Sequence, residues 1–256
     1  METISVCVVT KNEAHNIVDC LNTVAWANEI IVIDSESTDN TVALCKKFTD
    51  KVIISPWLGC GPQKKQVFAM ATCDWVLMLD ADERVSPELA SEIQQVLANP
   101  KYSGYEIPFQ SYFCGKRIRY GDWLNEKHLR LLRRKQSEIV PRLVHFGVKV
   151  NGPISCLKHR IDHYSFPNLH CVIDKMNRYS TDGAQHLLQT GKTSSIWSAI
   201  SHGLFGFLRG YVFKLGFLDG RHGYMLAIAN AQGSYYKYLK LIELNAAPKT
   251  DQPPAA

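Results

Sequence analysis

Apolar segments alternate with helical patterns through the first hundred residues of the chain. Four apolar segments, rich in Val and Ile, have the character of buried strands: residues 4–10, 29–35, 51–55 and 75–79. Three further segments show helical spacing of their apolar positions: residues 14–25, 61–72 and 86–98. Ser37 or Asp39 can cap another helix after the second strand. Apolar strands joined by single helices predict a mostly parallel sheet that is covered on both faces.

Polar residues follow three of these strands: Thr10 to Glu13, Asp34 to Ser37, and Asp80 to Glu83. In open sheets of this class, ligands bind beyond the carboxyl ends of the strands, so we expect these segments to converge on one edge. Two aspartates separated by one residue cannot easily both ionise in a confined site unless a cation neutralises them. Mg²⁺ or Mn²⁺ accepts carboxylate oxygens and keeps positions for substrate phosphates. We therefore predict Asp82 as a metal ligand, with Asp80 holding a ribose or a metal-bound water.

The pattern changes after residue 102. The stretch "GYEIPFQSYFCGKRIRYG" predicts hairpin-like β structure, and the chain becomes helical after residue 165. We expect a catalytic domain over 1–165, a helical extension over 166–245 and a disordered tail over 246–256. The longest uncharged run of the extension, 193–208, has 16 residues, which is short of the ~20 needed to cross a bilayer.

Aromatic residues and cations alternate in the segment 193–241 of this extension. Two interpretations stay open: the apolar groups pack on the catalytic domain, or amphipathic helices dock on an anionic membrane surface.

Charge and cysteine usage narrow the class of partner. The formal net charge is +5, and residues 116–158 contain eleven Lys and Arg against three acids. A phosphate-bearing or acidic partner is therefore plausible, but the basic stretch carries no recognised nucleic-acid motif. The eight Cys form no C-x-x-C pair and the N-terminus lacks a basic region, so we expect a reduced protein whose active domain faces the cytoplasm.

Three motifs occur in the order of a known enzyme family. The segments "VCVVTKNEAHNI", "IIVIDSESTDNT" and "DWVLMLDADERV" resemble the first-strand, second-strand and D-x-D motifs of the inverting glycosyltransferases of family 2. Later segments, "LRLLRR", "LKHRIDHYSF", "MNRYS" and "YVFKLGFLDGRHGYMLA", resemble the lipopolysaccharide-core β-1,4-glucosyltransferases. The resemblance covers nearly the whole chain. It implies the GT-A fold, an α/β nucleotide-sugar-binding fold with a central, mostly parallel sheet, here followed by a C-terminal helical amphipathic extension.

The same resemblance implies roles for five residues of the strand ends. Thr10 and Glu13 would line the nucleotide pocket, Asp34 would bind the uracil ring, Asp80 the ribose, and Asp82 the metal on the diphosphate. Structural alternatives remain, because Glu13 also favours a helix N-terminus and Asp34 also caps turns.

The residues themselves suggest further contacts with the donor. Lys64 and Lys65 could neutralise the diphosphate or could be ordinary lysines of a helix surface. His163 resembles in position a late His that GT-A enzymes use as a metal ligand. His159 and His163 are spaced i and i+4, so on a helix they could share one face and bind zinc. Ile161 and Tyr164 suit a strand equally well.

An inverting transfer also needs a carboxylate that takes the proton of the acceptor hydroxyl. In the family this base is the last acid of an acidic pair, and "GDWLNEKHLRLLRR" places Glu126 there, with Asn125 where the first acid often lies. Asp122 is the alternative base, and both acids could instead be solvated loop residues. A second departure is Phe146, which stands where related core enzymes often have Glu.

The basic cluster beside the expected base could bind a phosphorylated acceptor. Its members are Arg130, Arg133, Arg134 and Lys135. Bidentate Arg pairs suit phosphate, although such a run can also be a solvated face.

The sequence thus predicts a metal-dependent inverting glycosyltransferase on the cytoplasmic face of the inner membrane. The expected donor is a UDP-sugar, most simply UDP-glucose, and the expected acceptor is a lipid-linked inner-core heptose of lipooligosaccharide or lipopolysaccharide. Alternatives are another polysaccharide or lipid acceptor, or a membrane-docked scaffold that has lost activity. A phosphohydrolase is disfavoured because Arg84 follows a D-x-D motif in the fourth strand. Glucose and galactose are not distinguished.

Overall fold

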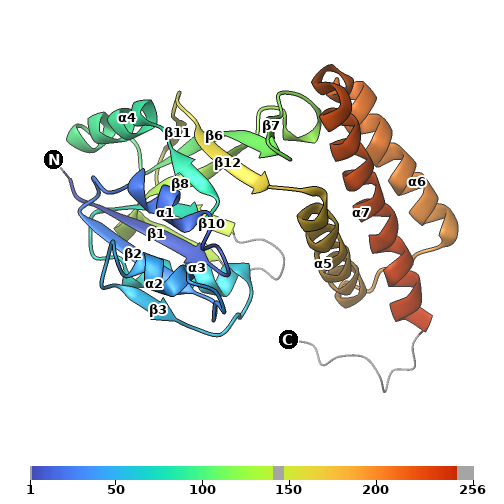
Figure 1. Cartoon of the computed structure of the whole chain (residues 1–256), viewed down its shortest axis with the longest axis horizontal. Helices are drawn as coiled ribbons and strands as arrows, with labels where there is room; N and C mark the ends of the chain where they lie inside the picture. Colours follow the sequence, from blue (N-terminus) through green and yellow to red (C-terminus); the bar gives the residue numbers. More distant parts are fainter. Residues whose placement is uncertain (1, 141–146, 247–256) are drawn as a thin grey trace. The chain divides into compact units, whose positions relative to one another are not determined.

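The computed structural model describes residues 2–140 and 147–246, which form two compact units (Figure 1). Unit 1 comprises residues 1–110 and 125–164, and unit 2 comprises residues 111–124 and 165–256. The chain therefore enters the second unit twice. It does so first at residues 111–124 and again from residue 165, whereas the sequence analysis placed a single boundary, near residue 165.

Unit 1 is built on four parallel strands that the apolar pattern predicted closely. They are β1 (Ile4–Thr10), β2 (Glu29–Asp34), β3 (Val52–Ile54) and β4 (Trp75–Asp80), arranged side by side in the order β3-β2-β1-β4. Four helices connect or follow them: α1 (Ile17–Asn22), α2 (Thr41–Cys45), α3 (Cys60–Met70) and α4 (Pro87–Ala98). The sheet is covered on both faces, as continuous apolar strands require.

The sheet continues beyond β4 with antiparallel and mixed pairing. Its order is β4-β8-β6-β12-β5, with β11 and β7 both paired to β6. The bounds are β5 (Glu83–Val85), β6 (Gly104–Phe113), β7 (Lys116–Arg117), β8 (Lys127–Arg133), β11 (Ile154–Cys156) and β12 (Ile161–Phe166). A separate two-stranded sheet consists of β9 (Ser137–Val140) and β10 (Gly147–Val150), and the short 3₁₀ helix η2 (Arg134–Gln136) precedes β9. β8 and β12 thereby bring residues from late in the sequence beside β4 and β5.

Alternate side chains of each central strand enter two hydrophobic cores. On β1, Val6 and Val8 pack with α1 and α4, whereas Cys7 packs with α3 and the β9–β10 hairpin. Burial raises the pKa of the Cys7 thiol well above its ordinary value, so this residue acts as a small apolar side chain. Ser86 begins α4 as predicted, because its hydroxyl accepts a hydrogen bond from the amide of Leu89.

Unit 2 contains a helical layer in which α7 lies between α5 and α6 (Figure 1). The long helices are α5 (Leu169–Gln189), α6 (Ile196–Phe207) and α7 (Gly220–Ala246). A π-helical segment, η3 (Leu208–Phe213), and a 3₁₀ turn, η4 (Gly216–Asp219), connect α6 to α7, and η1 (Gly121–Trp123) belongs to the same unit. Within residues 2–140 and 147–246, no helix combines the length and apolar character that a bilayer-spanning segment requires.

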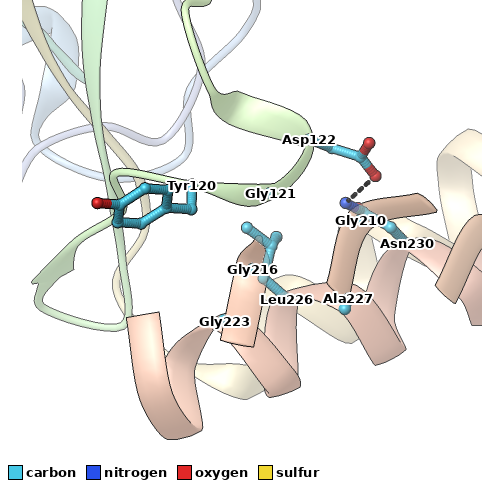
Figure 2. Close-up of a pocket in the computed structure, with 9 residues that line it drawn as sticks. All are labelled: Tyr120, Gly121, Asp122, Gly210, Gly216, Gly223, Leu226, Ala227 and Asn230. Carbon is cyan, nitrogen blue, oxygen red and sulfur yellow. Dashed lines mark hydrogen bonds between the residues drawn. The ribbon is translucent and has the colours of Figure 1, made fainter. Parts of the chain in front are cut away.

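Close backbone packing joins η3, η4 and α7 (Figure 2). A Cβ atom on Gly223 would lie 1.9 Å from the carbonyl oxygen of Gly216, and one on Gly216 would lie 2.6 Å from the carbonyl oxygen of Gly210. Larger residues at these positions would force the backbones apart. Gly216 and Gly223 of the "GFLDGRHG" stretch therefore serve packing within unit 2.

Glu29 joins several segments at the amino-terminal edge of the sheet. Its carboxylate accepts hydrogen bonds from the Ser5 and Thr72 hydroxyls and from the Thr72 amide, and it pairs with the Lys51 ammonium. Burial alone would raise the pKa of this carboxyl group. The hydrogen bonds, that of Lys51 foremost, outweigh burial and lower the pKa from 4.5 to about 2.

We expect Glu29→Gln to lower the free energy of unfolding by about 2–3 kcal/mol near neutral pH, because three partners lose a charged acceptor. Since the folded pKa is depressed, this stabilisation is present above about pH 4.5 and is lost as the pH falls toward 2. Urea denaturation of both proteins at several pH values measures the difference. The matched control is Glu138→Gln, at an exposed strand position, and an equal loss in both variants at all pH values would contradict the assigned role.

Candidate active site

The carboxyl ends of β1, β2 and β4 meet at one edge of the sheet, as the sequence predicted. Thr10 lies opposite Asp34 in the β1–β2 register, and Val9 lies opposite Asp80 in the β1–β4 register. Thr10 and Asp34 are both buried. Three of the five expected nucleotide contacts therefore lie next to one another on adjacent strands.

Asp80 is held by two buried cations. The Lys64 ammonium of α3 lies 2.8 Å from Asp80 Oδ1, and Arg130 Nη2 of β8 lies 3.1 Å from Asp80 Oδ2. Glu83 completes the group, because its Oε1 lies 2.5 Å from Arg130 Nη2 and its Oε2 accepts a hydrogen bond from the Asp80 amide. We call these four residues the charge quartet; they come from α3, β4, β5 and β8.

Within the charge quartet, the pKa values of the two carboxyl groups shift in opposite directions. Burial disfavours the charged form of Asp80, but the charges of Lys64 and Arg130 outweigh it and hold the pKa of Asp80 well below its ordinary value. For the fully buried Glu83, burial raises the pKa and Arg130 opposes that rise. Two cations and two carboxyl groups are close to charge balance, so Asp80 needs no further cation to remain ionised.

Asp82 has a different partner. Its Oδ2 lies 3.4 Å from His163 Nε2, and its carbonyl oxygen accepts a hydrogen bond from the Tyr164 amide. The β5–β12 pairing brings about this contact by placing His163 opposite Glu83. Burial disfavours the imidazolium form, but the hydrogen bond and charge of Asp82 outweigh burial and raise the pKa of His163. His163 thus lies on a strand, and the helical pairing with His159 is wrong.

The donor set at Asp82 suits a cation shared with a substrate. Among residues 2–140 and 147–246, no group of three or more His, Cys, Asp and Glu side chains is arranged to hold a metal. A Mg²⁺ or Mn²⁺ that takes most of its ligands from phosphates and water needs only one or two protein ligands. Asp82 and His163 offer one oxygen and one nitrogen at the same place, so these residues fit such an ion.

The loops after β1 and β2 are tied together by residues whose role the sequence did not reveal. The Asn12 amide donates to Ser37 Oγ at 2.7 Å, and Asn12 Oδ1 accepts from the Thr38 amide at 2.8 Å. Asp39 accepts from the Ala14 and Thr41 amides. The predicted cap role of Ser37 or Asp39 is therefore wrong: both side chains hold the two loops, and α2 begins only at residue 41.

Asp34 and Glu13 engage these loops. Asp34 accepts from the Ser37 amide at 2.8 Å and from its hydroxyl at 2.5 Å, which is the turn-capping contact foreseen as an alternative. Glu13 Oε2 accepts from Asn16 Nδ2 at 2.7 Å, and its carbonyl oxygen accepts from the Ile17 amide at the start of α1. Both residues thus have structural contacts at the same edge.

Glu126 lies at the start of β8, on the side of the sheet where β4 ends, since β8 runs antiparallel to β4. Its Oε1 lies 3.0 Å from His128 Nε2, and its carbonyl oxygen accepts a hydrogen bond from the Phe109 amide. Asn125, just before it, has a φ of 57°, in the left-handed region. The structure therefore brings the predicted base to the edge that carries Asp80 and Asp82, with a histidine partner that the sequence analysis did not name.

Four basic residues are placed differently from the predictions. Lys64 is buried with Asp80 and is not a helix-surface lysine, and the Arg130 guanidinium is buried between Asp80 and Glu83. Arg133 pairs with Glu2, and Arg134 donates to carbonyl oxygens of the segment before β4. Since Arg133 lies opposite Trp75, the first residue of β4, it is at the far end of that strand from Asp80. β8 and η2 thus distribute Arg130, Arg133 and Arg134 along the sheet, and their binding of an acceptor stays a prediction.

Asp122, the alternative base, is fully engaged within unit 2. Arg209 donates to both of its carboxylate oxygens, at 2.9 and 3.0 Å, Lys214 lies 3.2 Å from Oδ1, and Asn230 donates to Oδ2 (Figure 2). Burial opposes ionisation, but these contacts lower the pKa of Asp122, Arg209 contributing most. Asp122 therefore acts as an ion-paired anchor of η1. Phe146, the second departure from the family pattern, lies outside the described residues.

Comparisons with known proteins point to one enzyme family. The model of the family "Glycosyl transferase family 2" matches residues 5–154. An uncharacterized glycosyltransferase of Rickettsia typhi is 33% identical over 96% of this chain and 88% of its own. The lipopolysaccharide core biosynthesis glycosyltransferase LpsC of Rhizobium meliloti is 26% identical over 97% of this chain and 96% of its own. The crystal structure of Staphylococcus aureus TarS 1–349 aligns with a TM-score of 0.48 at 15% identity, over 95% of this chain and 91% of that one. With the family model spanning more than half of its length, this chain belongs to glycosyl transferase family 2 and has the GT-A fold expected from its motifs.

Proposed function

We propose that this protein is a metal-dependent, inverting hexosyltransferase that moves glucose from UDP-glucose onto an inner-core heptose of lipooligosaccharide or lipopolysaccharide. Family membership supports the reaction class, and the similarity to LpsC, a lipopolysaccharide core biosynthesis glycosyltransferase, supports the core acceptor. The observation that carries the proposal is the arrangement of three carboxylates at one sheet edge. Asp80 is neutralised by protein cations, Asp82 lies beside His163, and Glu126 immediately precedes the neighbouring strand β8.

The donor would bind at the edge formed by Thr10, Asp34 and Asp80. Thr10 Oγ1 is a buried hydroxyl without a hydrogen-bond partner among the described residues, which suits a polar ligand at this place. Asp34 would bind the uracil ring, exchanging part of its contact with Ser37, and Asp80 would accept a hydrogen bond from a ribose hydroxyl. Because the charge quartet keeps Asp80 ionised, it stays an acceptor throughout the reaction.

Asp82 and His163 would hold Mg²⁺ or Mn²⁺, whose positive charge stabilises the departing diphosphate when it is bound. Glu126 removes the proton of the acceptor hydroxyl as that oxygen forms a bond with the anomeric carbon. The bond from the anomeric carbon to the diphosphate oxygen breaks on the opposite face, so the configuration inverts and UDP leaves. The proton remains on Glu126 until solvent takes it.

A lipid-linked acceptor places the reaction at a membrane. We extend the proposal to peripheral association with the anionic cytoplasmic face of the inner membrane. The helical segment from Lys192 to Lys240 supports this location, because it contains six Lys and Arg against one acid, Asp219. Anionic lipid attracts such a surface.

Turnover of UDP-sugars by the purified protein with a heptose-terminated acceptor tests the reaction, with and without Mn²⁺. We expect UDP-glucose to be used and Asp82→Ala to reduce turnover by at least about 10³-fold, since the charge that would hold the ion is removed. Asp50→Ala, at an exposed turn position, is the matched control and should keep the wild-type rate. Wild-type turnover by Asp82→Ala would reject the metal role. Absence of turnover with every donor would favour the non-catalytic scaffold.

Replacement of Glu126 by Gln should leave binding of the UDP-sugar intact but reduce kcat by about 10²–10⁴-fold, the usual contribution of a general base. Donor titration and steady-state rates measured on the same preparation separate the two effects. The matched control is Glu138→Gln, at an exposed position of the β9–β10 hairpin. An unchanged kcat in Glu126→Gln would assign the base to another residue.

A further inference from the structure

Helix α6 exposes its large apolar side chains and buries its small ones. Positions 197, 200, 204 and 208 repeat at helical spacing and carry Trp, Ile, Leu and Leu, all of them exposed. Trp197 is 76% exposed and Phe213, in the following π-helical segment, 68%. We call the following set the apolar face: Trp197, Ile200, Leu204, Phe205, Leu208, Val212, Phe213, Phe217 and Leu218. Large apolar side chains exposed in this number along α6 and the turns that follow it mark an interaction site.

The packing on the opposite side of α6 explains why the helix cannot rotate about its axis to bury its large side chains. Ala199, Gly203 and Gly206 are buried. A Cβ atom on Gly203 would lie 3.1 Å from Tyr235 Cβ, and one on Gly206 would lie 3.6 Å from Ala231 Cα, both on α7. Only small residues allow this close helix contact. The sequence therefore commits the large side chains to the exposed side.

The charges around the apolar face identify the chemistry of its partner. Lys192 and Arg221 are exposed, and Arg209 and Lys214 are at least partly exposed while they share the single carboxylate of Asp122, which leaves a positive charge there uncompensated. Between residues 190 and 242, Asp219 is the one acid in the sequence, and its carboxylate is buried and accepts from the Arg119 and Tyr120 amides. A second copy of this chain would set cations against cations across a two-fold interface, whereas anionic lipid headgroups would pair with them.

We infer that unit 2 docks on an anionic bilayer through the apolar face, with α6 lying in the plane of the membrane. Trp197, Phe205 and Phe213 enter the boundary between headgroups and acyl chains, where aromatic residues are favoured. The surrounding cations meet lipid phosphates. This inference deepens the proposed location by naming the surface, and it does not depend on the identity of the donor or acceptor.

Sedimentation with sucrose-loaded vesicles of phosphatidylethanolamine and phosphatidylglycerol tests this surface in the full-length protein. We expect the double variant Trp197→Ser, Phe213→Ser to lose at least about tenfold in partition coefficient, since two large side chains no longer enter the lipid. The matched control, Trp57→Ser with Leu58→Ser, removes two exposed apolar residues of unit 1 and should bind as the wild type does. Phosphatidylcholine vesicles should bind the wild type more weakly, because the headgroup charge is absent.

Two results would overturn the inference. One is equal vesicle binding by the wild type and the Trp197, Phe213 variant, with thermal melting showing that both are folded. The other is a wild-type dimer in sedimentation velocity that becomes a monomer in this variant, because the apolar face would then be an interface between copies of the chain.

A separate observation concerns the general base of the proposed reaction. Phe109, buried on β6, holds both Glu126 and its partner: its amide donates to the Glu126 carbonyl oxygen at 2.8 Å, and the edge contact of its ring places the His128 ring 4.9 Å away. His128 Nε2 in turn lies 3.0 Å from Glu126 Oε1. A carboxylate accepts hydrogen bonds only, so His128 donates in this contact.

We propose that His128 is a positioning residue for Glu126, a role that rests on the proposed function of Glu126 as the base. Glu126 immediately precedes β8 and His128 is the second residue of that strand, and both side chains are partly exposed. The hydrogen bond selects one orientation, and the Phe109 ring keeps the imidazole in place to make it.

A double-mutant cycle tests this role. We expect His128→Leu, which preserves apolar contact with Phe109, to lower kcat about 10–100-fold with an unchanged KM for the donor. His128→Gln places an amide N–H near the position of Nε2 and should recover most of that loss. In the Glu126→Gln background, His128→Leu should have little further effect, because the carboxylate that it orients is gone.

Equal losses for His128→Leu and His128→Gln, or a full additional loss in the Glu126→Gln background, would overturn the positioning role alone. A wild-type rate in Glu126→Gln would instead overturn the proposed base together with the role of His128. The cycle thus distinguishes the two failures.

Discussion

The architecture of the candidate site depends on the compensation of buried charge around Asp80. Burial of the Asp80 and Glu83 carboxyl groups beside the end of an apolar strand would cost much free energy without cations, because burial removes water from both groups. Lys64 from α3 and Arg130 from β8 supply the cations. The charge quartet therefore connects four separate elements and requires α3 and β8 to lie on either side of the β4 end.

Under the proposed function, the same compensation would give the two aspartates of the D-x-D motif different roles. Asp80 is surrounded by fixed protein charge, so adding a metal ion there would oppose two neighbouring cations. Asp82 lies beyond the quartet, next to a histidine that can itself be a ligand when neutral. The electrostatics of this edge thus favour a cation at Asp82 and a neutral polar group of the donor at Asp80, although the two residues are separated by a single alanine.

Much of the fold could be predicted because strand burial is a local property of the sequence. The apolar runs of β1 and β4 and their polar ends sufficed to place Thr10, Asp34 and Asp80 on one edge. The charge quartet could not be predicted in the same way, since Arg130 and Asp80 are fifty residues apart and meet only through antiparallel pairing of β8 with β4. A basic run such as "LRLLRR" looks continuous in sequence, but a strand spreads it over opposite ends and faces of a sheet. For the same reason, Ser37 resembles a helix cap when only its neighbours in the sequence are considered. In the structure its hydroxyl oxygen accepts a hydrogen bond from the amide of Asn12, in another loop.

Helix α6 shows a different limit of sequence patterns. Its alternation of small and large apolar residues is compatible with either side facing inward, and hydrophobicity alone would bury the tryptophan and leucines. Close packing decides otherwise, because α7 approaches so near that only Ala and Gly fit between the helices. Dispersion contacts along this narrow interface, the ion-paired Asp122 and a separate core around Phe113 and Leu226 hold unit 2 together without the exposed side chains of α6. Those side chains are then available for a partner. An apolar surface that has cations nearby and lacks accessible carboxylates between residues 190 and 242 suits contact with lipid better than contact with water or with another copy of the chain.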